Sequence, residues 1–168
     1  IAYYNRAISR DKLEDYQGAI KDYTKAIDLN SNDASAYYNR AISRDELEDY
    51  QGAIEDYTKA IDLDPEKVSA YFNRGLSIGN LEDYQDAIED YTKAIDLDPE
   101  KVNAYFNRAI AKDILGDHKG AITDLNKVID LNPEDAIAYY NRAISRDKLE
   151  DYQGSIKDYT KAIEFDTE

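Results

Sequence analysis

The stretch Ala2-Tyr3-Tyr4-Asn5-Arg6 begins a pattern that returns every 34 residues along this 168-residue chain. Its later copies begin at Ala36, Ala70, Ala104 and Ala138. A second motif, Asp15-Tyr16-Gln17-Gly18, recurs at the same interval with few changes. Self-similarity at this period is typical of small supersecondary units that bury their apolar faces only against their neighbours. The sequence therefore predicts five stacked repeats rather than one globular core.

Each repeat contains two helical patterns joined by a short polar segment. In the first repeat, apolar and small residues recur at helical spacing from Ala2 to about Leu13 and again from Tyr16 to Leu29. Asp15 precedes the second pattern, where its carboxylate can accept hydrogen bonds from the free amides of the first helical turn. Three repeats close with a proline, which a helix does not easily continue through: Pro65, Pro99 and Pro133. We therefore expect a helix, a short turn and an aspartate-capped second helix in every repeat.

The repeats resemble tetratricopeptide repeats, which are helix-turn-helix units of 34 residues. The resemblance covers the whole chain and rests on residues that recur in each repeat, in the first one Tyr3, Ala7, Ala19, Tyr23 and Ala26. It implies an all-α fold, namely an α-solenoid of antiparallel helix hairpins that form a right-handed superhelix. The implied array is one domain, 1–168, without a C-terminal capping helix. Its repeats span about 1–33, 34–67, 68–101, 102–135 and 136–168.

Two rows of basic residues depart from that resemblance. Arg6 and its counterparts stand where the family usually carries a large apolar residue, and Arg10 and its counterparts stand where it carries an aromatic one. A guanidinium near a helix interface is costly unless it has a partner. Every repeat also carries an aspartate in its second helix: Asp22, Asp56, Asp90, Asp124 and Asp158. We expect arginine and aspartate to pair across each hairpin or with the next repeat. The alternative is that both are solvated.

The first helix of each repeat carries the candidate binding residues. In tetratricopeptide arrays these helices line the concave surface. The predicted packing face of the first one carries Tyr3, Ala7, Arg10 and Leu13, so the opposite face would form a groove. Rows of aromatic, asparagine, aliphatic and mostly acidic residues would line it. The candidate peptide-binding residues are Tyr4, Asn5, Ile8, Tyr38, Asn39, Ile42, Asp45, Phe72, Asn73, Leu76, Phe106, Asn107, Ile110, Asp113, Tyr140, Asn141 and Ile144.

The asparagine row carries the most specific functional hint. An amide side chain can donate to a peptide carbonyl and accept from a peptide amide, so a ladder of asparagines suits binding of an extended backbone. The row resembles the asparagine ladder in the repeat domain of O-linked N-acetylglucosamine transferase, which holds extended peptides. The alternative is that these side chains bond neighbouring helices. A carboxylate clamp of the chaperone-adaptor type is not expected, because Tyr4, Ser69 and Asn73 occupy the places of its basic residues.

The net charge and the residue composition limit the kinds of partner that the chain is expected to bind. The formal net charge of -15 repels phosphates, so neither nucleic acid nor an anionic membrane is a predicted partner, whereas a basic protein or peptide suits this field. No apolar run approaches the roughly 18 residues that span a bilayer. The chain has no cysteine, which excludes disulfides, thiolate metal sites and a cysteine nucleophile. That composition is compatible with a reducing compartment such as the cytoplasm and does not establish one.

No set of residues predicts catalysis, a metal or a cofactor. The acidic residues recur every 34 positions, whereas a catalytic pair needs one special place. His118 replaces the tyrosine that begins the second helix of the fourth repeat, and we interpret it as a packing or surface residue. The leading hypothesis is a non-enzymatic scaffold that binds a peptide segment of a partner protein in the groove. Another hypothesis is that the chain is a substrate-docking or regulatory arm of a larger enzyme.

The second hypothesis is a structural module that stacks head to tail. Residues Ala2–Asn30 and Ala138–Asp166 differ at only four of 29 positions. The last apolar face of the fifth repeat, around Tyr159, Ile163 and Phe165, would therefore accept the first repeat of another molecule much as it would accept a sixth repeat. Such a contact propagates rather than closing a two-fold dimer.

Overall fold

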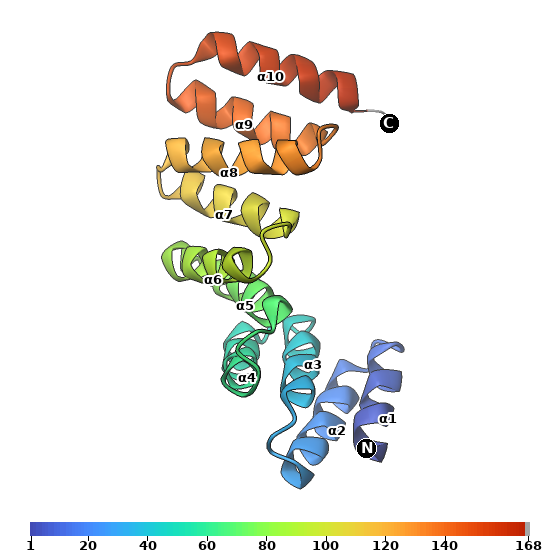
Figure 1. Ribbon diagram of the computed structural model, residues 1–168. Coiled ribbons are helices and arrows are strands. Elements are labelled where there is room, and N and C mark those ends of the chain that lie inside the picture. The colour runs from blue at the N-terminus through green and yellow to red at the C-terminus, as the bar shows by residue number, and fades with distance from the viewer. Residues whose placement is uncertain (167–168) are drawn as a thin grey trace. The chain divides into compact units, whose positions relative to one another are not determined.

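In the computed structural model, residues 1–166 are described, and within them ten α-helices form (Figure 1). The helices are α1 Ala2–Asp11, α2 Tyr16–Leu29, α3 Ala34–Asp45, α4 Tyr50–Leu63, α5 Val68–Asn80, α6 Tyr84–Leu97, α7 Val102–Ile114, α8 His118–Leu131, α9 Ala136–Lys148 and α10 Tyr152–Phe165. The chain divides into two compact parts, which we call the N-terminal half (Ile1–Asp83) and the C-terminal half (Tyr84–Glu168). Each half is described by itself.

Within each half, the helices pair as hairpins that stack on one another. In the N-terminal half, α1 packs on α2 and α3 packs on α4, while α2 contacts α3 and α4 contacts α5. In the C-terminal half, α7 packs on α8 and α9 packs on α10, while α6 contacts α7 and α8 contacts α9. The all-helical repeat fold that the 34-residue period predicts is confirmed.

Aspartate caps start α2, α4, α8 and α10 as predicted. The side chain of Asp15 accepts a hydrogen bond from the backbone amide of Gly18 at 3.0 Å, and Asp49, Asp117 and Asp151 cap α4, α8 and α10 in the same way. The first helix ends at Asp11, two residues before the predicted Leu13. It ends there because the chain turns back through Glu14, which adopts a left-handed backbone with φ 60°.

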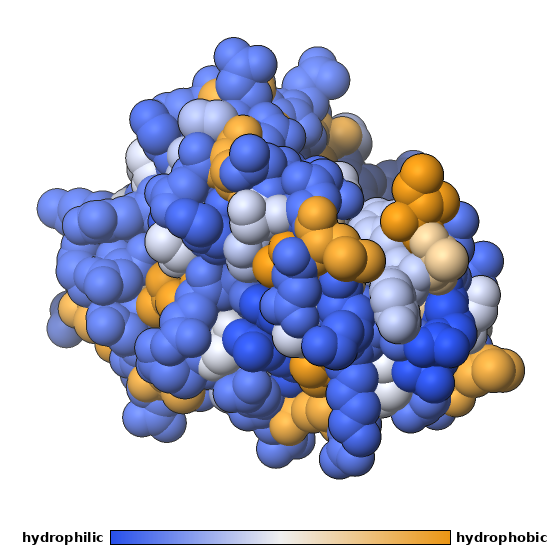
Figure 2. Space-filling model, turned by 90° about the horizontal axis from the view of Figure 1, so that it is seen from below, coloured by the Kyte–Doolittle hydropathy of each residue, from blue (hydrophilic) through white to orange (hydrophobic). Residues whose placement is uncertain are grey.

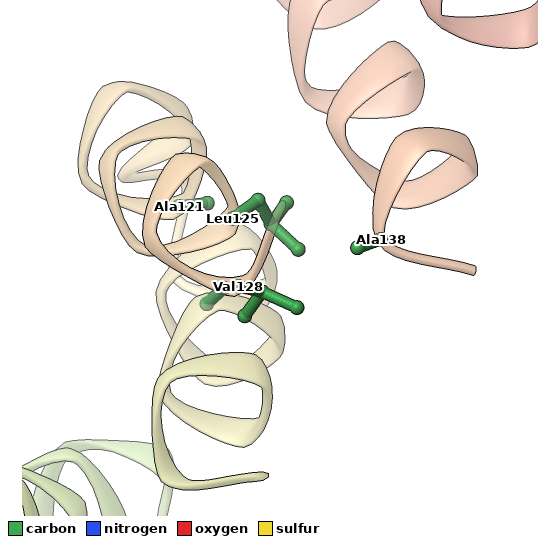
Figure 3. Close-up of a cluster of buried hydrophobic side chains, with 5 residues drawn as sticks. Ala121, Leu125, Val128 and Ala138 are labelled. Atoms are coloured by element: carbon green, nitrogen blue, oxygen red, sulfur yellow. The ribbon is translucent and has the colours of Figure 1, made fainter. Parts of the chain in front are cut away.

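Small residues bring the two helices of a hairpin close together. Ala7 of α1 and Ala19 of α2 are fully buried beside Tyr23, and Ala41, Ala53 and Tyr57 form the equivalent cluster between α3 and α4. In the fourth repeat, Leu125 takes the place of this tyrosine. It lies with Ala109, Ala121, Val128 and Ala138 in one buried cluster, in which Ala138 of α9 faces the side chains of α8 (Figure 3). Burial of these side chains is the main stabilising contribution in each hairpin.

The surface of the protein is mostly hydrophilic. On the face that Figure 2 shows, hydrophilic residues cover most of the surface and hydrophobic ones lie in small separate groups. Among the described residues, none of the helices has the length and apolar character needed to cross a membrane.

Candidate functional site

A two-point ion pair joins the two helices of a hairpin. Nε and Nη2 of Arg40 donate to Oδ2 and Oδ1 of Asp56 at 2.8 and 2.6 Å. Nη1 of Arg44 lies 3.2 Å from the same carboxylate. The pairs that repeat the Arg40–Asp56 geometry are Arg6–Asp22, Arg108–Asp124 and Arg142–Asp158. The predicted pairing is therefore confirmed in these repeats, and the solvated alternative is wrong for them, since all four aspartates are buried.

The same arginines also connect consecutive repeats. Nη1 of Arg40 donates to Oγ1 of Thr24 on the preceding α2 at 2.9 Å. Arg74 makes the equivalent bond to Thr58 and Arg108 to Thr92, both at 2.9 Å. One guanidinium thus uses its fixed fork of donors to hold an aspartate of its own hairpin and a hydroxyl of the neighbouring repeat. These polar contacts replace the apolar packing that the family usually has at this position.

The predicted groove aromatics lie closer to the core than expected. The ring of Tyr4 packs edge-on against Tyr23 with centroids 5.7 Å apart, and Tyr38 packs against Tyr57 at the same separation. Ile8 contacts the same buried cluster as Tyr4. The assignment of this face as opposite to the packing face was therefore wrong in part. The physical reason is that the small alanines let the second helix approach so closely that its tyrosine reaches this face.

The predicted packing face also needs correction. Ala7 is buried as expected, but Leu13 is 80% exposed because it lies beyond the end of α1, in the turn. The residues equivalent to Tyr3 face the arginine row: the Arg40 guanidinium carbon lies 5.6 Å from the centre of the Tyr37 ring. This ring therefore packs against a guanidinium of its own helix, and the same guanidinium reaches the preceding repeat through Thr24.

The asparagine row has two different structural settings. Nδ2 of Asn39 donates to the hydroxyl of Tyr4 at 2.7 Å, and Asn73 donates to Tyr38 at 3.0 Å, each across one repeat boundary. Asn141 instead donates to its own helix, to the carbonyl of Ile137, because the residue at the tyrosine position one repeat earlier is Phe106, which has no hydroxyl. Asn107 likewise donates to the carbonyl of Asn103. The structural alternative, a bond to a neighbouring helix, is therefore confirmed for Asn39 and Asn73, whereas Asn107 and Asn141 bond carbonyls of their own helices. An amide has two donors and an acceptor.

The acidic row also makes internal contacts. Asp45 accepts hydrogen bonds from the hydroxyls of Tyr57 and Ser77, both at 2.7 Å, and burial raises the pKa of this carboxyl. Asp11 accepts from Tyr23 and Ser43 in the same way. Each of these carboxylates therefore links its own hairpin to the next repeat. The sequence replaces both partners together at one place, where the third repeat has Gly79 for the aspartate and the fourth has Ala111 for the serine.

An aspartate and a histidine of the fourth repeat lie together with a serine of the fifth. Oδ1 of Asp113 lies 2.8 Å from Nδ1 of His118 and accepts a hydrogen bond from Ser145 at 2.8 Å. A hydrolytic triad needs the serine to donate to the histidine, whereas here Asp113 lies between them. His118 takes the position of the tyrosines that begin other second helices, and its contact holds α7 and α8 together.

Two hollows in the N-terminal half gather several of the predicted residues. The first, of about 320 Å³, is lined by Asp11, Lys12, Tyr16, Asn39, Ile42 and Glu46. The second, of about 330 Å³, is lined by Ile42, Asp45, Glu46, Tyr50, Tyr57, Asn73, Leu76, Ser77 and Asn80. Ile42 and Glu46 belong to both hollows, so the two are adjacent on α3. We call this pair of hollows the α3 groove.

The α3 groove includes residues that sequence reasoning missed, among them Tyr16 and Tyr50. Tyr16 and Tyr50 begin second helices, directly after the capping aspartates, and were not considered part of the first-helix surface. Their recurrence every 34 residues beside the cap was the available signal. The remaining predicted residues lie outside the hollows. Asn5 and Tyr140 are exposed, and the others are half-buried: Tyr4, Ile8, Tyr38, Phe72, Phe106, Asn107, Ile110, Asp113, Asn141 and Ile144.

The stacked hairpins define a helical-repeat protein. Models of the tetratricopeptide repeat match residues 1–33, 34–67, 68–101, 90–123 and 136–168, and a further model described as TPR repeat matches residues 114–146. The chain therefore belongs to the tetratricopeptide repeat family, as the sequence resemblance implies. No curated protein matches the chain at a significant level.

Solved structures of the same fold are numerous. A crystal structure of MamA superposes with a TM-score of 0.94 at 24% identity, covering 98% of this chain and 90% of that one. MamA 41-end from Desulfovibrio magneticus RS-1 superposes with a TM-score of 0.92 at 21% identity, covering 98% and 93%. YrrB, described as a TPR protein with an unusual peptide-binding site, superposes with a TM-score of 0.89 at 24% identity, covering 99% and 86%. At these identities the likeness establishes the fold.

Proposed function

We propose that this protein is an interaction scaffold that binds an extended, basic segment of a partner protein in the α3 groove. Tetratricopeptide repeat proteins are generally non-enzymatic scaffolds, and the family assignment supports this class of function. The observation that carries the proposal is the continuity of the two hollows along α3. They place Asn39 and Asn73, one repeat apart, beside the shared residues Ile42 and Glu46.

The chemistry of the groove favours a peptide backbone with positive side chains. Asn39 has one donor engaged within the protein, and Asn73 bonds the hydroxyls of Tyr38 and Tyr57. The carbonyl oxygen of each asparagine and the second donor of Asn39 are therefore left for a peptide amide or carbonyl. Ile42 and Leu76 supply apolar contact, and the exposed carboxylate of Glu46 adds negative charge to both hollows. The net charge of -15 would speed the approach of a basic segment. The peptide-binding description of YrrB, a protein of the same fold, supports this class of ligand.

Selection from a displayed library of random short peptides on the immobilised chain tests the proposal. We expect lysine- and arginine-rich sequences to be enriched, and we expect the double variant Asn39→Ala, Asn73→Ala to bind them more weakly. If each asparagine contributes one or two backbone hydrogen bonds of about 0.5–1.5 kcal/mol, affinity falls about 5-fold or more. Glu46→Gln should weaken binding in low salt, while Glu55→Gln, on the exposed side of α4, should leave it unchanged.

Tyr4→Phe is the matched control for the asparagine ladder. It removes the internal hydrogen bond between Tyr4 and Asn39 but leaves the Asn39 amide in the groove. Binding should therefore survive Tyr4→Phe and fall with Asn39→Ala. If the two variants weaken binding equally, the asparagine acts only by holding the helices together. Enrichment of acidic or purely apolar peptides, or binding that ignores every groove variant, would contradict the proposed site.

A further inference from the structure

The first helix of the chain exposes the side chains that later first helices bury. Ala2 is exposed, whereas its counterparts Ala36, Ala70, Ala104 and Ala138 are fully buried. Ser9 is exposed, whereas Ser43, Ser77 and Ser145 are at most 1% exposed. This surface of α1, which we call the head face, thus has the composition of an interface between repeats and lies open within residues 1–166.

The last hairpin exposes the complementary side. Ile163 of α10 is 76% exposed, whereas its counterparts Ile27, Ile61 and Ile95 are 7 to 9% exposed. A pocket of about 410 Å³ opens beside it and is lined mainly by apolar side chains from α9 and α10, including Ile137, Tyr140, Tyr159, Ala162 and Ile163. We call this surface the tail face. Apolar area of this kind on the end of a repeat array favours burial by a further repeat.

The head face and the tail face also carry matching hydrogen-bond donors and acceptors. At the junction of the first two repeats, three hydrogen bonds cross the boundary, from Asn39 to Tyr4, from Arg40 to Thr24 and from Ser43 to Asp11. The tail face carries the same three acceptors at the corresponding positions: Tyr140, Thr160 and Asp147. The head face carries the same three donors: Asn5, Arg6 and Ser9.

The backbone setting of these groups is repeated as well. Residues Ala2–Asn30 and Ala138–Asp166 differ at four of 29 positions, so α9 and α10 copy the α1–α2 hairpin against which α3 packs. The Arg6 side chain is 57% exposed while that of Arg40 is 12% exposed, although both hold their aspartates in the same two-point geometry. The head face is therefore already arranged for the contact that Arg40 makes.

We propose that this 168-residue chain associates head to tail, with the head face of one copy seated on the tail face of another. Asn5, Arg6 and Ser9 of one copy donate to Tyr140, Thr160 and Asp147 of the next, and Ala2 packs near Ile163. Because the two faces differ, the contact is heterologous and leaves a free face at each end, so it propagates. The net charge of -15 on each copy opposes it, and salt promotes it by screening that repulsion.

Light scattering after size exclusion, over a series of protein and salt concentrations, tests this arrangement. The mass should rise above the monomer value of 19.2 kDa with protein concentration and further with salt. Ser9→Glu, which brings a carboxylate against Asp147, blocks the head face, and Ile163→Glu blocks the tail face. Each variant alone should remain at 19.2 kDa, because every contact needs both faces. Mixed in equal amounts, the two should form a dimer that does not grow.

Ile114→Glu is the control, since Ile114 is 54% exposed in the fourth repeat and belongs to neither end face. This variant should associate like the unmodified chain, and circular dichroism should show unchanged helicity in all three variants. A monomeric mass at high concentration and high salt overturns the proposal. So does a dimer of the unmodified chain that survives Ser9→Glu, since that contact does not use the head face. Because neither blocked residue lies in the α3 groove, peptide binding there can fail without affecting this result.

Discussion

Arg40 and Asp56 face each other across the α3–α4 hairpin with two hydrogen bonds, in a setting where their side chains are 12% and 5% exposed. A carboxylate and a guanidinium so far removed from water are compensated only by each other and by neighbours such as Arg44 and Thr24. The four equivalent aspartates that pair in this way make the inside of each hairpin polar at one point. Removing the aspartate should therefore lower the stability of the chain by a different amount from removing the arginine.

The first prediction concerns this pair. Asp56→Ala leaves two guanidinium groups without their shared carboxylate and should lower the free energy of unfolding by about 3–5 kcal/mol. Arg40→Leu should cost less, about 1 kcal/mol, because Asp56 keeps Arg44 at 3.2 Å and leucine restores an apolar contact. Urea unfolding followed by circular dichroism measures both, with Asp62→Ala on the exposed side of α4 as control. Equal losses from the two variants would contradict this account.

The second prediction concerns acid. Hydrogen bonding from Arg6 holds the pKa of Asp22 below its ordinary value of 3.8. The unfolded chain therefore binds the proton more readily, so the stabilisation from ionised Asp22 is complete above pH 3.8 and is lost as pH falls through the lower folded-state pKa. Asp22→Asn cannot ionise, so its deficit in Tm relative to the unmodified chain should shrink as the solution is acidified below this range. A deficit that stays constant with pH would argue against the pairing.

The third prediction concerns the turn inside each hairpin. Glu48 has φ 58°, in the left-handed region that costs an L-residue about 1 kcal/mol, while the equivalent Gly116 has φ 85°. Glu48→Gly should therefore stabilise the chain by up to about 1 kcal/mol, reduced by the greater freedom of glycine in the unfolded state. Gly116→Ala should destabilise it, although a Cβ there would meet no atom within 4 Å.

Thermal unfolding of the two turn variants provides the measurement. Glu55→Gly, in the interior of α4, is the control and should lower Tm, because glycine there loses helical propensity without relieving strain. Opposite signs for Glu48→Gly and Glu55→Gly are the expected result. If both variants lower Tm alike, the left-handed turn carries no strain that glycine relieves.

The fourth prediction concerns alkaline pH. Burial and the hydrogen bond to Asp45 raise the pKa of Tyr57. Its neutral phenol is therefore favoured in the folded state. The stability that this phenol contributes is present below the ordinary tyrosine pKa of 10 and is lost as the pH rises above that value. Tyr57→Phe should cost about 1.5–3 kcal/mol at neutral pH, and this cost should diminish above pH 10.

Urea unfolding at both pH values tests this expectation. Tyr152→Phe is the control, because Tyr152 is exposed and its phenol should contribute little to stability. A cost of Tyr57→Phe that grows with alkalinity would mean that the buried phenol does not resist ionisation.

The helices themselves were accessible from the sequence because their determinants are local. The second helix of the first repeat begins at Tyr16 and ends at Leu29 as predicted, since Asp15 caps it and the apolar spacing persists along it. The predicted end of the first helix was wrong because the left-handed turn is formed by Glu14, and no glycine at that position indicates the turn in the sequence. The partnership of arginine and aspartate was also predictable, because buried opposite charges occurring once per repeat have few other ways to be compensated.

What the sequence by itself determined is therefore the repeat, its two helices and the identity of the groups that must pair. Only the tertiary structure decided which face each group serves. Tyr4 packs against Tyr23, Asn39 bonds Tyr4 of the previous repeat, and Ser43 bonds Asp11, so side chains expected to face a ligand hold the helices together. Helical periodicity places residues on a face, but the distance at which the alanines let two helices meet determines how far a tyrosine reaches. That distance arises from packing between segments, which no local pattern encodes.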